Sequence, residues 1–452
     1  MLQPIVRPLQ EFLSTETAGG VLLLLAAIAA LIWANAPGTD SYADFWNAHI
    51  HLDLNVVDLD LSLQHWVNDA LMAIFFFVVG MEIKRELLKG ELADPRKAAL
   101  PVAAALGGMI VPALIYASMN FGGDGSHGWG IPMATDIAFA VGVLTLLGTR
   151  VPVSLKVFLL ALAITDDLGA IAVIAIFYSE SIEFGWLAAA VGAVALTAVM
   201  GRLGVRDLIV YIAVGLFAWL AVYESGVHAT IAGVALGLLA PVNAFFSNRE
   251  VEQRVMGLAE ELRRGEAEGT PEGDELGRSA LRELEELARE SRPVLDRLEH
   301  ALHPWTSYAI IPIFALANAG VELSGDTVRD AATSPVGLGV ALGLMLGKPI
   351  GITLFSFVAV RSGLASLPGG VSWAMLAATG MIAGIGFTVS LFIADLAFDS
   401  AALVDEAKIG ILAGSALIGV AGFVALRWLS PAPAASRESH ASSREITEEA
   451  SA

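Results

Sequence analysis

The amino-acid sequence lacks cysteine and is poor in charge, and both shortages restrict the class of protein. With no cysteine among 452 residues, disulfides, thiolate metal sites and cysteine nucleophiles are excluded. Only 16% of the residues are charged while 56% are hydrophobic, a balance that argues against a soluble enzyme. The start of the chain also lacks the basic residues, short apolar run and cleavage site of a secretory signal. The composition therefore predicts an all-α integral membrane protein, in which 45 glycines permit close helix packing.

Apolar runs long enough to cross a membrane recur along the whole sequence. A transmembrane helix needs about 20 apolar residues, so runs of this length between polar, glycine or proline residues are candidate spans. We expect twelve transmembrane helices, at approximately 17–36, 66–83, 98–119, 130–148, 154–178, 184–200, 207–223, 228–245, 304–321, 335–359, 371–397 and 406–429.

The basic residues indicate the orientation, because short loops rich in lysine and arginine stay on the cytoplasmic side. Of the 26 lysines and arginines, 23 fall on one side of the predicted topology, Lys348 falls inside a span, and Arg329 and Lys408 fall on the other side. Both termini are therefore predicted to be cytoplasmic. The net charge of −20 lies mostly in the stretch 249–299, the tail and the loops, which indicates solvated surface and no nucleic-acid partner.

The chain divides into four predicted parts, with transmembrane helices 1–8 in residues 1–246 and helices 9–12 in residues 299–430. Residues 51–63 alternate apolar and polar, which predicts an external β-hairpin, with a solvated loop as the alternative. A second copy of the chain would cover the hairpin's open edges, so we expect a homodimer through this segment. The charged cytoplasmic insertion 247–298 has amphipathic leucine spacing and is expected to be a helical hairpin or partly disordered. The tail 431–452, rich in Ser, Ala, Glu and Pro, is expected to be a disordered cytoplasmic segment.

Ionisable residues inside the spans are few, and each is a candidate functional residue because intramembrane charge is costly. They are Asp136, the adjacent pair Asp166 and Asp167, and Lys348. Adjacent aspartates lie about 100° apart on a helix, so one can face an ion while the other meets a counter-charge. A salt bridge that only joins helices is the alternative for Asp136 or Lys348 alone, but one lysine cannot neutralise three carboxylates. Carboxylates in a low-dielectric cavity have raised pKa values and suit hard cations, so such a site favours exchange of protons for cations.

Two of the predicted spans are interrupted near their middle. Pro132 precedes Asp136 in the fourth span, and three glycines, Gly380, Gly384 and Gly386, interrupt the eleventh. Interrupted helices in corresponding places of two halves are typical of transporters with inverted repeats. Spans 3–5 and 10–12 would be the two repeats.

Several motifs follow one another through most of the chain and together resemble one family. The most specific are IPMATDIAFA around Asp136 and AITDDLGA around the aspartate pair. The full set of matching stretches is 68–87, 132–140, 163–170, 225–230, 298–305, 347–349 and 384–388. In these stretches the sequence resembles the NhaA family of bacterial Na+/H+ antiporters.

The resemblance implies twelve helices with inverted repeats, of which this family is itself an example, and unwound helices 4 and 11 that cross at mid-membrane. It implies electrogenic exchange of intracellular Na+ or Li+ for extracellular H+, without a cofactor. Asp167 would be the principal ion and proton carboxylate, and Asp166, which shares Na+ with it, would pair with Lys348. Asp136 and Thr135 would lie at the unwound crossing, and either Asp166 or Lys348 would carry the second proton.

The resemblance also implies regulation by pH and a place in the lipid of the bacterial cytoplasmic (inner) membrane. The positions that match the family's pH-responsive residues are Glu82, Glu299, His300, His303 and His228. For the histidines, ordinary packing or solvation is an equally weighted alternative.

Three features depart from the family pattern. The insertion precedes Glu299 directly, Thr165 precedes the aspartate pair, and Asp395 lies late in the eleventh span. These departures bear on the pH profile and the cation preference more than on the activity.

Two other functions would also use buried carboxylates. An intramembrane aspartyl hydrolase is disfavoured because no Gly-x-Gly-Asp occurs within a span and adjacent aspartates cannot flank one scissile bond. A channel or a non-transporting sensor would need a continuous pore and would give no reason for proton competition. The sequence therefore favours a transporter over an enzyme.

Overall fold

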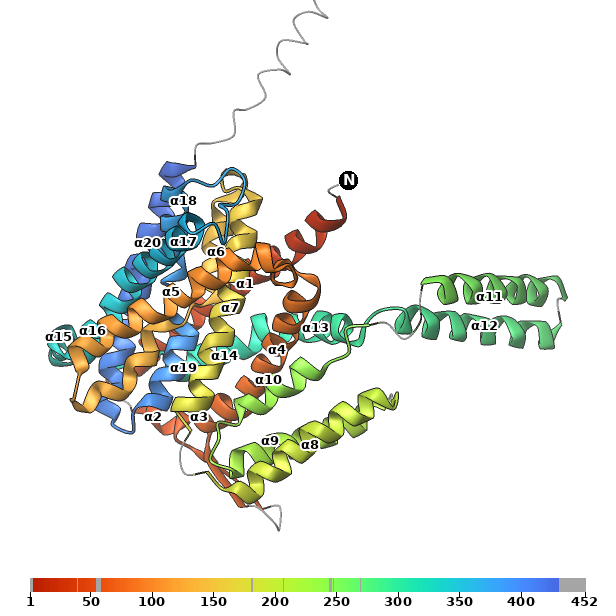
Figure 1. Cartoon of the computed structure of the whole chain (residues 1–452). Coiled ribbons are helices and arrows are strands. Elements are labelled where there is room, and N and C mark those ends of the chain that lie inside the picture. Colours follow the sequence, from red (N-terminus) through yellow and green to blue (C-terminus); the bar gives the residue numbers. More distant parts are fainter. Residues whose placement is uncertain are drawn as a thin grey trace, which may run out of the picture. The chain divides into compact units, whose positions relative to one another are not determined.

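The computed structural model describes residues 3–38, 40–53, 58–179, 182–205, 207–243, 246, 248–268 and 270–430, and helices dominate it (Figure 1). The α-helices are α1 (Gln3–Ala34), α2 (Ser41–Trp46), α3 (Leu63–Trp66), α4 (Met72–Lys89), α5 (Pro95–Asn120), α6 (Ile137–Leu146), α7 (Val153–Phe177), α8 (Phe184–Arg202), α9 (Leu208–Glu224), α10 (Thr230–Leu239), α11 (Asn248–Glu268), α12 (Pro271–Glu290), α13 (Val294–Trp305), α14 (Ile311–Asn318), α15 (Gly325–Thr333), α16 (Pro335–Leu342), α17 (Lys348–Arg361), α18 (Trp373–Ala383), α19 (Phe387–Ala397) and α20 (Ala401–Leu429).

Short segments of other geometry connect or interrupt these helices. The 3₁₀ segments are η2 (Glu91–Ala93), η3 (Asp124–Met133) and η4 (Gly148–Arg150), and the π-helical segments are η1 (Val67–Leu71), η5 (Thr306–Ile310) and η6 (Gly343–Gly347). Two strands, β1 (His49–Asp53) and β2 (Asp58–Ser62), complete the described elements.

Among the described residues, seven continuous helical stretches are long and apolar enough to cross a membrane: Glu16–Ala34, Leu63–Lys89, Pro95–Asn120, Val153–Phe177, Phe184–Arg202, Pro335–Arg361 and Ala401–Leu429. Two bent helix pairs, η3 with α6 and α18 with α19, are also long and apolar enough when each pair is taken together. The chain is therefore a multi-pass membrane protein built from helices.

The other three predicted spans coincide with shorter helical segments. The range 207–223 falls on α9, 228–245 contains α10, and 304–321 contains η5 and α14. Length and composition alone do not mark these segments as membrane-crossing. The count of twelve transmembrane helices therefore stays a prediction.

The chain forms two compact units. Unit 1 comprises Met1–Gln64, Lys89–Tyr178 and Ile311–Ala452, and unit 2 comprises His65–Leu88 and Ser179–Ile310. All the ionisable residues predicted to bind ions belong to unit 1.

Close helix packing in unit 1 depends on glycine. A Cβ atom placed on Gly107 of α5 would lie 2.1 Å from the carbonyl oxygen of Gly351 on α17, and a Cβ on Gly351 would lie 2.0 Å from that of Gly107. No other residue fits at this distance. Contact between small residues is how membrane helices approach closely without a hydrophobic driving force.

The two stretches that the sequence predicted to be repeats have the same order of elements. In each, a long helix is followed by a bent pair and then by another long helix: α5, η3 with α6 and α7 in the first, and α16 to α17, α18 with α19 and α20 in the second. The inverted relation between them remains a prediction.

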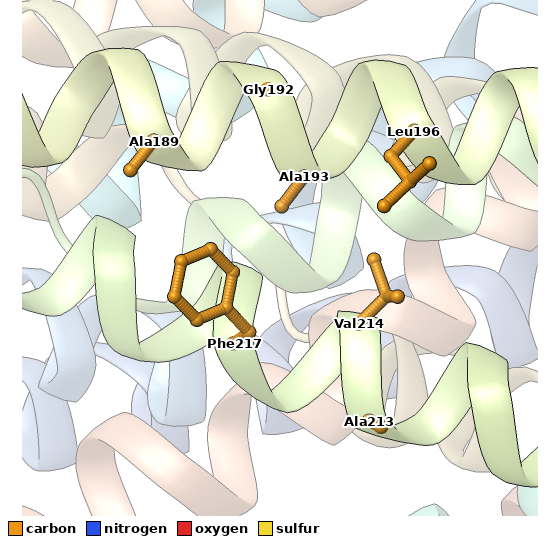
Figure 2. A pocket seen from close by; sticks show the side chains of 7 residues that line it. All are labelled: Ala189, Gly192, Ala193, Leu196, Ala213, Val214 and Phe217. Carbon is orange, nitrogen blue, oxygen red and sulfur yellow. The ribbon is translucent and has the colours of Figure 1, made fainter.

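Unit 2 contains an apolar groove between α8 and α9, which lie side by side (Figure 1). Figure 2 shows that small side chains and Phe217 line it. The lining residues are Ala189, Gly192, Ala193, Leu196, Ala213, Val214 and Phe217. None of these side chains has an oxygen or a charge, so they offer no ligand to an ion.

The strands β1 and β2 pair antiparallel within unit 1, with Ile50 opposite Leu61. Leu59 and Leu61 of β2 are buried while Asp60 between them is exposed, the period-2 pattern of a half-buried strand. Residues 54–57, which connect the strands, lie outside the described residues. The external position of this segment and its role in a dimer remain predictions.

Within the insertion, α11 and α12 pack against each other as two neighbouring helices (Figure 1). Their contact buries Leu258, Ala280 and Leu287, with Leu262 and Leu284 packed against this small core. Of the two alternatives that the sequence left open, these residues form the helical hairpin. The predicted disordered tail 431–452 lies outside the described residues.

Candidate functional site

The two bent pairs of unit 1 meet at their interruptions. The axis bends by 41° between η3 and α6, and by 48° between α18 and α19. The backbone N–H of Asp136 donates to the carbonyl of Ile385 at 2.7 Å, and the Thr135 hydroxyl donates to the carbonyl of Ala383 at 2.8 Å. We call the two non-helical segments, 134–136 and 384–386, the crossing. Non-helical backbone inside a membrane protein is tolerated only where neighbouring groups satisfy it, and these two hydrogen bonds contribute to that.

Asp136 caps two half-helices with one carboxylate. As the N-cap of α6, its side chain accepts a hydrogen bond from the N–H of Phe139 at 3.0 Å. Its Oδ2 also accepts from the N–H of Thr388 at 3.1 Å and from the Thr388 hydroxyl at 2.6 Å, at the start of α19. Only 2% of Asp136 is exposed. Because both helices begin here, the negative charge faces two positive helix ends.

Lys348 is fully buried and reaches the same place from α17. Its Nζ lies 2.5 Å from Oδ2 of Asp166 and 2.9 Å from the hydroxyl oxygen of Thr135. The π-helical turn η6 ends directly before Lys348, and such turns often occur at functional sites. The ammonium group therefore connects the aspartate pair on α7 with the crossing.

The aspartate pair lies on α7, and both members are buried. Asp166 faces Lys348, while Asp167 projects about 100° further around the same helix. Among the described residues, the Oδ1 atom of Asp166 has no hydrogen-bond partner. The hydroxyl of Thr165 donates to the carbonyl of Ala161 one turn earlier on α7, at 2.7 Å, so this hydrogen bond lies within α7.

Of the five residues that the sequence predicted to bind ions, Lys348 directly contacts Asp166 and Thr135, while Asp167 and Asp136 follow these two residues in the chain. Three carboxylates, one ammonium and two hydroxyls, those of Thr135 and Thr388, gather around the interrupted helices. Such an oxygen-rich, partly neutralised set of groups suits a hard monovalent cation and protons that compete for the same carboxylates.

A second group of charges lies in unit 2 and contains three of the residues predicted to respond to pH. Arg85 of α4 forms an ion pair with Glu299 of α13, and His303 Nε2 lies 4.0 Å from Glu82 Oε1. We call Glu82, Arg85, Glu299 and His303 the Glu299 cluster. Burial raises the pKa of the Glu299 carboxyl above its usual range, and the neighbouring Arg85 and His303 oppose this shift.

The other two predicted histidines are placed differently. His300 is exposed on α13, one residue after Glu299. His228 lies two residues before the first residue of α10. The carbonyl of Ala240, at the other end of α10, accepts a hydrogen bond from Lys84, which is next to Arg85 in α4. The 10 residues of α10 separate these ends by about 15 Å, so the structure does not bring His228 to the cluster.

Sequence reasoning missed several residues that contact the site. Thr388 stood in a quoted motif but had no predicted role, and Arg85 was used only to orient the chain. Ser415 of α20, which accepts hydrogen bonds at the start of α19, had no sequence signal because isolated serines are common in apolar helices. The departure Asp395 pairs with Lys408 at 3.2 Å, a lysine that the sequence placed at the edge of a span.

Comparisons with known proteins agree with this arrangement of groups. Residues 10–426 match the family model described as Na+/H+ antiporter 1. The Na(+)/H(+) antiporter NhaA of Rhodopirellula baltica is 47% identical over 444 residues, which cover 96% of this chain and 97% of the relative. Antiporters of the same name from Anaeromyxobacter sp. and Oleidesulfovibrio alaskensis are 49% and 45% identical, and each alignment covers 95% of this chain and at least 94% of the relative. The chain therefore belongs to the Na+/H+ antiporter 1 family, whose members are transporters and not enzymes.

Proposed function

We propose that this protein is an electrogenic secondary antiporter that exchanges intracellular Na+ or Li+ for extracellular H+. The exchange would take place at Asp166 and Asp167, with Asp136, Thr135 and Lys348 around them. Two arguments support this proposal. The relatives that align with this chain over nearly their whole length are named Na(+)/H(+) antiporters, and the motif residues named here are buried.

The observation that carries the proposal is the buried contact of Lys348 with Asp166, directly beside Asp167. If all groups are ionised, one ammonium faces three carboxylates, so the site keeps a net negative charge that attracts a cation. A buried site with this excess is expensive unless a cation or protons compensate it. An empty, fully ionised site is therefore unfavourable. Release of Na+ is then coupled to binding of protons, and release of protons to binding of Na+.

Binding of Na+ and of protons is mutually exclusive in this scheme. When the site faces the cytoplasm at alkaline pH, the carboxylates lose protons and only the ionised pair attracts Na+ strongly enough to remove its water. When the site faces outward, protons return to Asp167 and to either Asp166 or Lys348, and the cation is expelled. The bundle that carries the crossing would move between the two orientations.

Electrogenic exchange follows if two protons move for each Na+. One proton would be carried by Asp167 and the other by the Asp166–Lys348 pair. One net charge then crosses the membrane in each cycle, so an inside-negative voltage drives extrusion of sodium. Currents measured on a solid-supported membrane after a sodium jump test this, and the apparent sodium affinity should fall as the pH falls. Electroneutral exchange would contradict this part of the proposal.

Regulation by pH is proposed to reside in unit 2. In the Glu299 cluster, Glu299 is buried beside Arg85 and His303, so its protonation changes the charge of a packed contact between α4 and α13. His300 and His228 lie apart from this contact, and we propose a secondary role for them. The insertion α11 to α12 ends four residues before the start of α13, close enough in sequence to influence the response.

We propose that the protein lies in the bacterial cytoplasmic (inner) membrane with both termini in the cytoplasm, and that it is a homodimer. The dimer would form through residues 51–63, because Ile50 and Leu52 of β1 expose apolar side chains beside an open strand edge. Deletion of residues 51–63 should give monomers in mild detergent with exchange intact. Dimers that survive the deletion would remove this segment from the interface.

The exchange itself is tested in inverted membrane vesicles that hold an acid interior. Addition of Na+ should dissipate the pH gradient for the parent protein, and Asp167→Asn should abolish the response because it removes both a charge and a titratable group. Asp395→Asn is the matched control, since it alters another ion-paired, partly buried aspartate of unit 1 outside the crossing. More than a trace of exchange in Asp167→Asn would reject our assignment of that carboxylate.

A further inference from the structure

The first turn of α19 begins inside the protein, and its backbone N–H groups need acceptors. The first N–H groups of any α-helix have no partner within the helix. At this helix the N–H of Thr388 donates to Asp136, at 3.1 Å. The two preceding N–H groups, those of Gly386 and Phe387, donate instead to the hydroxyl oxygen of Ser415, at 3.2 and 3.4 Å.

Ser415 reaches this turn from the neighbouring helix α20. It is buried, with 5% of the residue exposed, and its hydroxyl oxygen is shared by two donors. The start of α19 is thus held by two side chains of different charge, the carboxylate of Asp136 and the neutral hydroxyl of Ser415. Ordinary N-caps come from the residue that precedes the helix, whereas these acceptors come from elsewhere, Asp136 from the non-helical segment before α6 and Ser415 from α20.

We infer that Ser415 is a positioning residue of the exchange reaction, which holds the start of α19 and offsets its positive end beside Asp136. This inference rests on the proposed function. The N-terminus of a helix carries a partial positive charge, and any part of it that no acceptor offsets disfavours a cation nearby. Ser415 therefore lets the carboxylates at the crossing act on Na+ instead of compensating the helix end.

Loss of the hydroxyl has a defined consequence. In Ser415→Ala, two buried N–H groups lose their acceptor, so the first turn of α19 should open more often and its positive end should face the site. We expect the concentration of Na+ that gives half-maximal exchange to rise by about fivefold, the factor that corresponds to one lost helix cap.

Two matched variants separate this role from packing. Cysteine has nearly the shape of serine, but its sulfur is a weak acceptor, so Ser415→Cys keeps the packing and weakens the cap. Ser356 of α17 is a fully buried serine whose hydroxyl has no hydrogen-bond partner among the described residues. Ser356→Ala therefore removes a buried hydroxyl that caps no helix.

The experiment measures Na+ half-saturation in vesicles and backbone hydrogen exchange of residues 384–390 in the full-length protein in detergent. Both Ser415 variants should raise the half-saturation concentration and speed the exchange of these amides, while Ser356→Ala should leave both unchanged. Parent-like values in Ser415→Cys, or an equal effect in Ser356→Ala, would overturn the inference. The hydrogen-exchange readout needs no transport, so it tests whether Ser415 holds the start of α19 separately from its effect on Na+. An inactive parent would contradict the proposed function, whereas unchanged amide exchange in both Ser415 variants of an active protein would contradict only the role of Ser415.

Discussion

The crossing in unit 1 and the Glu299 cluster in unit 2 both contain an ion pair between residues far apart in the sequence, but only the pair in unit 2 has a member on the protein surface. The side chains of Lys348 and Asp166 are 0% and 1% exposed, whereas those of Arg85 and Glu299 are 36% and 8% exposed. In a fully buried pair, a change in the charge of one member must be accompanied by binding or release of another ion, because an uncompensated charge there is costly. A pair with one member in contact with water can gain or lose a proton by itself. The first arrangement suits coupled exchange of ions, and the second suits a response to pH.

The largest expected effect comes from removing the buried cation of the crossing. Lys348→Ala leaves Asp166 buried without its counter-charge, which we expect to cost about 3–5 kcal/mol of stability. It should also shift the pH profile of exchange, because the ammonium offsets one of the adjacent carboxylates. Thermal unfolding in detergent and exchange at several pH values measure these effects. A variant that unfolds like the parent with the same profile would show that the pair does not matter.

A second, largely buried ion pair of unit 1 tests whether burial alone sets this cost. The side chains of Asp395 and Lys408 are 14% and 7% exposed, and their atoms lie 3.2 Å apart. Asp395→Asn leaves Lys408 without this partner, but Asp405, one turn before it on α20, can attract the ammonium. We therefore expect a loss of about 1–3 kcal/mol, smaller than for Lys348→Ala, in the same unfolding assay. A loss of stability as large as that of Lys348→Ala would mean that the cost does not depend on the position of the pair at the crossing.

The ion pair of unit 2, in which only Arg85 is partly exposed, should tolerate the same kind of truncation better. Arg85→Ala removes a guanidinium that already contacts water, so we expect a loss of about 1 kcal/mol. Exchange at saturating Na+ and alkaline pH should persist, while the pH at which activity begins should move upward because Glu299 loses the group that favours its ionised form. A loss of stability equal to that of Lys348→Ala would break the comparison between the two units.

The smallest effect concerns the dependence of stability on pH at Glu299. Its raised pKa means that the folded state holds this proton more tightly than the unfolded chain. The resulting stabilisation is fully present below the unfolded pKa of about 4.3 and is lost as the pH rises through the folded value. The groups that face Glu299 are Arg85, His303 and Asp296, and burial outweighs the two that lower its pKa.

Glu299→Gln should therefore flatten part of the pH dependence. The unfolding midpoint of the parent, minus that of the variant, should decrease as the pH rises above about 4.3. The exposed Glu260 of α11 provides the control for removing a carboxylate, and Glu299→Gln should change the slope more than Glu260→Gln does. A difference that stays constant or grows with pH would contradict a raised pKa.

The order of these effects also bears on the two histidines outside the cluster. His300 is exposed, and His228 lies at the far end of α10. If substitution of either shifts the pH profile more than Arg85→Ala does, the response does not depend on the Glu299 cluster. The difference between the fully buried pair, Lys348 with Asp166, and the partly exposed pair, Arg85 with Glu299, would then affect stability alone.

The groove between α8 and α9 illustrates a different limit of the sequence. Its small residues were visible as glycine and alanine in an apolar run, but their arrangement around Phe217 required the structure (Figure 2). Composition predicts that helices pack closely, and it does not say which helices face each other.

The sequence by itself determined the class of protein, the positions of the long helices and the identity of the buried charges. Apolar length and the cost of charge in lipid are local properties, so Asp136, Asp166, Asp167 and Lys348 could be recognised without a structure. The two interruptions were likewise visible, as Pro132 in one span and a set of glycines in the other.

Only the tertiary structure decided which groups meet. Lys348 contacts Asp166 across 182 positions of sequence, and Thr388 contacts Asp136 across 252. These contacts exist because α5 and α17 approach through facing glycines and because two bent pairs meet at their breaks. Helical periodicity places a side chain on a face of its own helix, but the partner of that face depends on how distant helices pack. For this reason the caps that Asp136 and Ser415 provide at the start of α19 appear only in the folded molecule.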